Sequence, residues 1–219
     1  MIEVPALLEL VSVNVGEPAF LAVHRGHPVT SGIVKRPVQV DTLWLDRINL
    51  KGDGQADREV HGGEDKAVYA YPSEHIASWS EQLSEQLGPA AFGENLTTAG
   101  WVESDVGIGD LWGWGDAVLE VCQPRWPCYK LGILRGSQAF VGTFRASGRT
   151  GWYLRVLEPG TVPVAGPIVV AERHAAGVTV LDVHEARLHG TSPEQLDLLL
   201  DLAPLSDEWK GGLARMRRD

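Results

Sequence analysis

The sequence predicts a mainly β fold, a barrel or sandwich, followed by a small unit of three short helices. Short runs of alternating apolar and polar residues, separated by frequent glycine and proline, indicate strands over the first two thirds of the chain. Too few helices separate these runs to supply the crossovers that a parallel sheet requires. After Arg173 the apolar spacing becomes helical. We therefore expect a β-barrel domain over residues 1–173 and a three-helix domain over 174–219.

The strands expected in the β region are short and lie between turn residues. Residues 8–15 alternate most clearly between apolar and polar side chains. Four further runs are rich in apolar and β-branched or aromatic residues and are predicted as strands: 43–48, 67–71, 117–122 and 152–157.

One helix is expected to interrupt the β region, from Ser73 to just before Gly88. Its apolar residues Ile76, Trp79, Leu83 and Leu87 follow one another at spacings of three, four and four, which gives one apolar face.

Three helices are expected near the C-terminus, each with its own start signal. Thr179, Ser192 and Ser206 are suitable N-caps, and Pro193 stands where a first helical residue tolerates proline. Gly177 marks the expected hinge between these helices and the β domain.

The composition restricts the class of protein and its environment. The 219 residues carry a formal net charge of −10, so a phosphate backbone would repel the molecule, and we expect no nucleic-acid partner. Two cysteines are too few for a disulfide scaffold, which favours a reduced, cytoplasmic protein. No secretion signal and no run of about 18 apolar residues is recognisable, so we expect no membrane association.

The segment around Cys128 has the highest density of reactive groups. Two prolines stiffen a loop after an expected strand, and Cys128 lies between the cations Arg125 and Lys130. Nearby positive charge favours the thiolate, the form of cysteine that attacks electrophiles or ligates a soft metal. The alternative is a small buried side chain without a chemical role. Cys122 ends an apolar run and is expected to be structural.

A glycine-rich loop over residues 52–66 brings three cationic or titratable side chains together. Arg58, His61 and Lys66 could grip an anion, because glycines let backbone N–H groups approach a phosphate and arginine offers a fork of donors. Five acidic residues in the same loop nearly cancel this charge, so a solvated turn is the alternative. The loop lacks the Gly-Lys-Ser/Thr ending of a P-loop.

Two further stretches offer polar groups with weaker signals. Residues 92–98 contain the amide of Asn95 and two hydroxyls, and residues 148–155 contain Arg149 and Arg155 around a glycine. Either stretch could equally be an ordinary turn with solvated side chains.

These stretches, taken in order along the chain, resemble the MOSC family, the domain also found at the C-terminus of molybdenum cofactor sulfurases. The resemblance is to the YiiM-like bacterial branch, whose three-helix appendage the C-terminal helices match, and it covers most of the chain. The residues that carry it are 31–35, 57–58, 61–63, 66–72, 92–96, 123–125, 127–128, 130–131, 151–153 and 155–157.

The resemblance implies a MOSC-type β-barrel that binds the pterin-based molybdenum cofactor. Cys128 would ligate molybdenum or carry sulfur, and the expected cofactor-binding residues are Arg58, His61, Lys66, Asn95, Arg125, Lys130 and Arg149. The branch is associated with reduction of N-hydroxylated compounds, such as N-hydroxylated purines and amidoximes. Such an enzyme would need an external electron-donor protein, because the sequence has no flavin, nicotinamide or iron–sulfur fingerprint.

Other functions use the same residues and stay open at this point. A non-catalytic carrier would bind the cofactor, or hold a persulfide on Cys128, without turning over a substrate. A hydrolase would pair Cys128 with His61 as base, and a zinc site would use Cys122 and Cys128. The sequence is compatible with a monomer or a homodimer.

Overall fold

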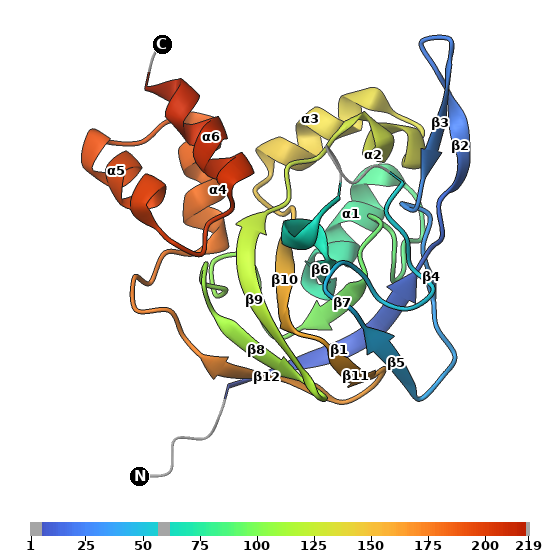
Figure 1. The fold of residues 1–219 in the computed structure, drawn as a ribbon. Coiled ribbons are helices and arrows are strands. Elements are labelled where there is room, and N and C mark those ends of the chain that lie inside the picture. Colours follow the sequence, from blue (N-terminus) through green and yellow to red (C-terminus); the bar gives the residue numbers. More distant parts are fainter. Residues whose placement is uncertain (1–5, 57–61, 218–219) are drawn as a thin grey trace.

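The computed structural model describes residues 6–56 and 62–217, and its centre is a closed β-barrel (Figure 1). The last strand pairs with the first, which closes the ring, and all neighbours are antiparallel except β6 and β7. In pairing order the strands are β12 (Pro167–Glu172), β8 (Leu111–Trp114), β9 (Ala117–Pro124), β10 (Trp152–Glu158), β6 (Val68–Pro72), β7 (Leu96–Ala99) and β1 (Ala6–Val15).

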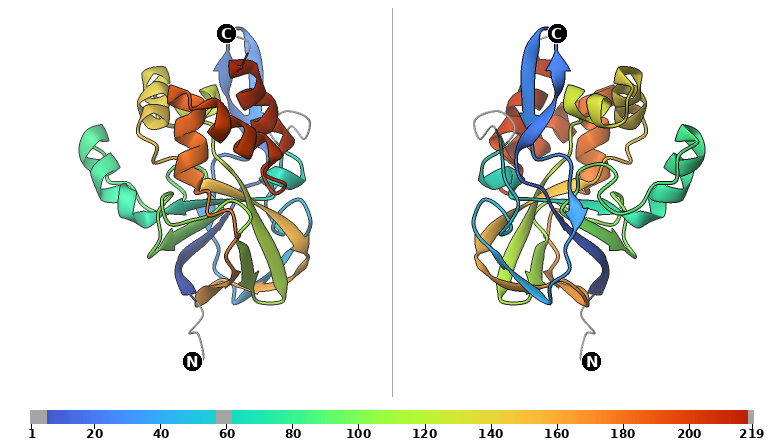
Figure 2. Two further views of the ribbon diagram at one scale, coloured as in Figure 1. Left: turned by 90° about the vertical axis from the view of Figure 1, so that its left-hand side faces the viewer. Right: turned by 90° about the vertical axis from the view of Figure 1, so that its right-hand side faces the viewer.

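Five further strands extend or flank the barrel. β4 (Arg36–Pro37) pairs with the end of β1, and β5 (Thr42–Leu45) pairs with β11 (Gly160–Pro163). β2 (Ala19–His24) and β3 (His27–Ser31) form a hairpin that projects from the barrel on the same side as the helices (Figure 2). Its two-residue turn, Arg25-Gly26, has positive φ at both positions, as the tightest hairpin turns require.

Helices gather at one end of the barrel and form two groups. The first comprises the 3-10 turns η1 (Glu64–Lys66) and η2 (Ser73–His75) with α1 (Ile76–Leu83), α2 (Tyr129–Leu134) and α3 (Gln138–Ala146). The second is the C-terminal helical unit of α4 (Val180–His189), α5 (Pro193–Asp201) and α6 (Asp207–Met216). Within the described residues, no helix combines the length and the apolarity that a bilayer crossing requires.

The structure confirms the predicted mainly β class, the five predicted strands and the three C-terminal helices. Thr179 forms a capping box with α4, and the hydroxyls of Ser192 and Ser206 accept backbone N–H groups of α5 and α6. The predicted helix over 73–87 is one turn too long, because Ser84 adopts a left-handed conformation that ends α1 at Leu83.

The expectation of a single helix inside the β region is wrong, because α2 and α3 also lie there. α2 begins directly after the Pro127-Cys128 loop and is only six residues long, too short for a helical period to be visible in the sequence. α3 buries Phe140 and Phe144 against Trp79 of α1, with ring centroids 5.3 and 5.4 Å from the indole. Both helices therefore depend on tertiary contacts rather than on their own sequence pattern.

The apolar core of the barrel continues into the C-terminal helical unit. A single cluster of buried side chains includes Leu119 and Trp152 of the barrel together with Val183, Trp209 and Leu213 of the helices. The helical unit is thus held in place by buried apolar contacts. The boundary between residues 173 and 174 as a division between domains stays a prediction.

Candidate functional site

A cavity of about 270 Å³ opens where the end of the barrel, the loop after β9 and the C-terminal helical unit meet. Its walls come from segments far apart in the sequence: the end of β3 with the loop after it, residues 53–56, η1, β6, β9, β10 and α6. Five predicted site residues line it: Lys66, Asn95, Arg125, Cys128 and Lys130.

Cys128 occupies the position immediately before α2 and faces this cavity. Its backbone is extended and its side chain makes no capping hydrogen bond to the helix, so the thiol is not used to hold α2. Cys128 is half-buried, whereas Cys122 is fully buried. The Cys122 thiol contacts the backbone oxygens of Asp65 and Tyr153 at 3.3 and 3.5 Å, and burial raises its pKa. Of the two cysteines, Cys128 is therefore the one with access to a ligand.

Arg125 places a positive charge deep in the cavity wall. Only 5% of the residue is exposed, its guanidinium stacks 4.5 Å from the Tyr69 ring centre, and it donates to the carbonyl oxygen of Phe92 at 2.6 Å. Burial raises the pKa of Tyr69 and of Tyr153, so both remain neutral phenols. No carboxylate pairs with Arg125 among the described residues, so its charge is available to an anion in the cavity.

Lys35 and Asp53 form a second charged element of the wall. The Lys35 ammonium is paired with the Asp53 carboxylate, which also accepts the backbone N–H of Gly16 at 2.8 Å and the amide of Asn95 at 2.9 Å. Burial lowers the pKa of Lys35, and the neighbouring Asp53 opposes that effect. Asn95 also accepts the N–H of Tyr69 at 3.1 Å. Its amide is therefore engaged in holding Asp53 and β6 in position.

Neither Lys35 nor Asp53 was identified as a site residue from the sequence. Lys35 appeared only within the motif 31–35 that supports the family resemblance, and Asp53 appeared only as one of the acids that offset the loop cations. The burial of Lys35 and its ion pair with Asp53 are visible only in the structure.

Lys66 and Lys130 complete the cationic lining. Lys66 forms an ion pair with Glu208 of α6, with 2.5 Å between Nζ and the carboxylate oxygen. Lys130 is 8% exposed and has no hydrogen bond or ion pair in the described part of the chain. Buried lysines are rarely left without a counter-charge, so Lys130 is a second group that a bound anion could satisfy.

The C-terminal helical unit contributes directly to the cavity through α6. Glu208 and Trp209 line it, and the hydroxyl of Ser206 donates to the buried side-chain oxygen of Gln123 on β9. The sequence left the role of these helices open. The structure shows that they form part of the cavity wall.

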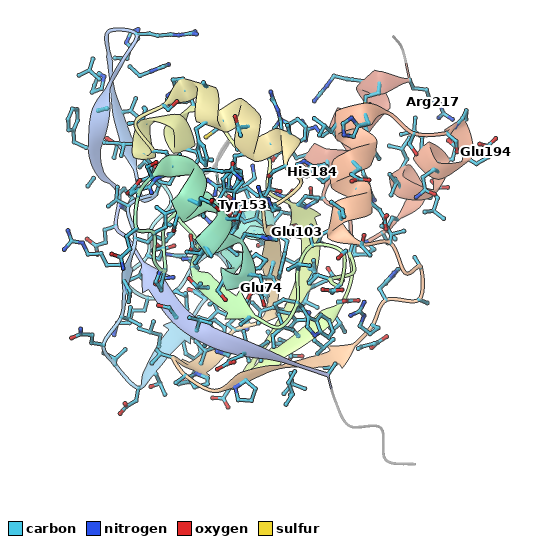
Figure 3. All side chains as sticks on the ribbon, turned by 180° about the vertical axis from the view of Figure 1, so that it is seen from behind. Glu74, Glu103, Tyr153, His184, Glu194 and Arg217 are labelled. Carbon is cyan, nitrogen blue, oxygen red and sulfur yellow. The ribbon has the colours of Figure 1, made fainter. Side chains whose placement is uncertain are left out.

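Trp126, two residues before Cys128, anchors the cysteine loop to the helical unit. Its ring lies 4.4 Å from the Arg187 guanidinium and 5.7 Å from the ring of Trp209. His184 of α4 also contacts it, at 5.5 Å between ring centres, and Figure 3 shows His184 where α4 meets α3. The loop that presents Cys128 is therefore fixed from the barrel side and from the helix side.

The remaining predicted site residues lie elsewhere or cannot be placed. Arg149 does not line the cavity: its guanidinium lies 4.3 Å from the ring of Trp79 and donates to Ser78 at 2.9 Å. Arg58 and His61 lie outside the described residues, as does the proposed His61–Cys128 pairing. Among the residues that are described, no group of three or more histidine, cysteine or acidic side chains is arranged to hold a metal ion.

The chain belongs to the MOSC domain family, whose model matches residues 57–169, just over half of its length. Within that family it is YiiM-like. The crystal structure of YiiM from Geobacillus stearothermophilus superposes with a TM-score of 0.79 at 30% identity, covering 95% of this chain and 98% of that one. The uncharacterized protein YflK of Bacillus subtilis is 39% identical over 209 residues, covering 95% of this chain and 94% of YflK.

A third relative has a different length and a name that refers to an activity. The protein named "Reductase" of Gibberella moniliformis is 34% identical over 194 residues. The match covers 81% of this chain but 34% of the fungal protein, so the similarity concerns one region of a longer molecule.

Proposed function

We propose that this protein binds the molybdenum cofactor in the 270 Å³ cavity and reduces N-hydroxylated compounds with electrons from a separate donor. The observation that carries the proposal is the position of Cys128, a half-buried thiol that shares one cavity with the buried cations Arg125 and Lys130. A thiolate is a good ligand for a soft metal, and unpaired buried cations are suited to a phosphate. Both parts of a pterin–molybdenum cofactor would thus find partners.

The residues present fit this cofactor in charge and in the chemistry of their donor groups. Cys128 would hold the metal, while Arg125, Lys130, Lys66 and Lys35 surround the space available to a phosphate. Gly32 lines the same wall, and a Cβ at that position would lie 2.4 Å from the carbonyl oxygen of Gly54. Only glycine permits this close approach of the two backbone segments, which brings residues 31–35 and 53–56 together at the cavity.

The protein would contribute binding, orientation and exclusion of water, while the cofactor contributes the redox chemistry. When bound, the cofactor supplies the two electrons with which an N–OH group, taking up two protons, becomes N–H and water. Arg125 is fixed by its contacts with Tyr69 and Phe92 and can orient an anionic group without rearrangement. Trp126, which is partly exposed, provides an apolar wall for the planar ring of the cofactor.

Reduction rather than simple storage is favoured by the fungal relative named "Reductase". An iron–sulfur cluster of the four-cysteine type is impossible with two cysteines in the chain, so electrons would have to come from another protein or domain. The alternative is a carrier that holds the cofactor, or a persulfide on Cys128, without turning over a substrate. The test must distinguish this carrier from a reductase.

The first test measures molybdenum per chain by elemental mass spectrometry after production in a host that makes the cofactor. Wild type should contain roughly one molybdenum per chain, Cys128→Ala should lose it, and the matched control Cys122→Ala should keep it. Metal-loaded wild type is then given benzamidoxime and chemically reduced methyl viologen. Formation of benzamidine supports the reductase. Bound metal without product would identify a carrier, and absence of metal from wild type would refute cofactor binding.

A further inference from the structure

Positive charge is concentrated in two segments of this acidic chain. Residues 18–40 and 121–157 contain nine of the 19 lysines and arginines and none of the 29 aspartates and glutamates. The remainder of the chain therefore carries all of the acidic residues. So uneven a distribution gives the molecule a strong electrostatic asymmetry despite its net charge of −10.

The two acid-free segments meet at a groove beside the projecting hairpin. The groove has a volume of about 630 Å³ and lies between β2–β3 and the start of α2. The ring of His24 stacks on the ring of Tyr129, with centres 4.7 Å apart and an interplanar angle of 25°. We call this the basic groove and define it by its polar and aromatic residues: His24, Arg25, His27, Tyr129 and Lys130.

Three of the nine cations in the two segments are paired with carboxylates, and Lys35, which pairs with Asp53, is one of them. Arg135 pairs with Glu85, and Arg155 pairs with Asp65 and Glu120, so their charges are offset. Arg25 is exposed at the hairpin turn, and neither it nor Lys130 has a carboxylate partner in the described part of the chain. Arg36, Arg125, Arg145 and Arg149 likewise form no ion pair among the described residues, so the groove carries part of the uncompensated positive charge of the two segments.

The basic groove adjoins the cofactor cavity. Lys130 and Ala56 line both spaces, and Tyr129 follows Cys128 directly in the chain. A molecule bound in the groove would thus contact Tyr129 and Lys130, the two residues that follow the proposed metal ligand Cys128 in the chain. Because the two spaces share lining residues, a partner bound in the groove would lie beside the proposed cofactor, which would not be so for an isolated charged patch.

We propose that the basic groove is the docking surface for an acidic electron-donor protein. The proposal rests on the proposed reductase function, which requires electrons from outside the chain. Phe20 and Val23 of β2 are 67% and 65% exposed, so the strand that carries His24 also offers apolar contact. Complementary charge would steer the donor to the side of the molecule where Cys128 lies.

A protein partner fits these features better than a nucleic acid. The groove holds only two cations without a carboxylate partner, and the other 159 residues carry all 29 acidic groups. A long phosphate backbone extending beyond the groove would meet this negative charge, whereas a compact acidic protein need touch only the groove.

The experiment uses flavodoxin, a small acidic flavin protein, as the probe. Its binding to the cofactor-loaded wild type, Arg25→Glu and Arg47→Glu is measured by calorimetry at about 20 mM ionic strength. Arg47 is the matched control, because it is also exposed but follows β5 and does not line the basic groove. Reduction of benzamidoxime is then followed with flavodoxin and, separately, with reduced methyl viologen, which needs no docking surface.

Arg25→Glu should weaken flavodoxin binding about tenfold and slow the flavodoxin-driven rate to a similar extent, while the viologen-driven rate is unchanged. Arg47→Glu should behave as wild type, and about 200 mM salt should reproduce the loss in wild type. Equal effects of the two substitutions, no flavodoxin binding by wild type, or tighter binding of single-stranded DNA in the groove would overturn the docking proposal. Charge-dependent flavodoxin binding without any viologen-driven reduction would instead refute the proposed function and leave the docking surface intact.

Discussion

The two cysteines provide a direct test of the site, because the structure gives them opposite environments. Cys122 is fully buried on β9, between β8 and β10, and its thiol contacts two backbone oxygens. Iodoacetamide can reach it only after this part of the barrel opens. If opening costs at least about 4 kcal/mol, as is usual for a core strand, Cys122 should react roughly a thousandfold more slowly than an accessible thiol.

Cys128 needs no such opening, since it already lines the cavity. We therefore expect native protein to take up one label per chain rapidly at neutral pH, at Cys128, and a second label only in denaturant. Peptide mass spectrometry over a time course separates the two sites. Comparable labelling rates for Cys122 and Cys128 in native protein would refute the assigned environments.

Three further substitutions test the architecture through stability. Gly32→Ala should lower the unfolding free energy by about 1–3 kcal/mol in urea titration, because its Cβ would lie 2.4 Å from the Gly54 carbonyl oxygen. Gly88→Ala is the control and should be nearly neutral, since nothing lies within 4 Å of its Cβ position. Thr179→Ala removes the capping box and should cost about 1 kcal/mol, or roughly 2–4 °C in Tm by calorimetry. Burial lowers the pKa of His184 in the folded protein, so at mildly acidic pH the unfolded chain binds a proton that the folded chain does not. The unfolding free energy of wild type should therefore decrease as pH falls below about 6.5. His184→Gln should reduce that slope in a pH series of unfolding curves, and an unchanged slope would show that other groups cause it.

The sequence predicted elements well where local pattern and tertiary environment agree. Residues 8–15 alternate because one face of β1 is buried in the barrel, and Thr179, Ser192 and Ser206 are visible as caps because capping is local chemistry. β11 was harder to recognise. It is four residues long and is defined by its pairing with β5 across the fold rather than by its own periodicity.

For the site, the sequence identified the reactive segment but only part of its surroundings. Arg125, Cys128 and Lys130 are neighbours along the chain, so their association was visible before any fold was known. Lys35 and Asp53 join them through a buried ion pair between two segments 18 residues apart, which no local pattern predicts. Arg149 was an equally plausible cation in the sequence, yet its side chain lies on Trp79, outside the cavity.

The sequence by itself determined the fold class, the starts of the three C-terminal helices, the family resemblance and the reactive segment around Cys128, because these depend on residue type and short-range spacing. Only the tertiary structure decided that α6 closes one wall of the cavity, that Cys122 is inaccessible, and that the hairpin meets α2 in a basic groove. Those properties depend on which distant segments the closed barrel brings into contact. Which distant segments come into contact is determined by the burial of apolar surface over the whole chain rather than by the sequence of any one segment.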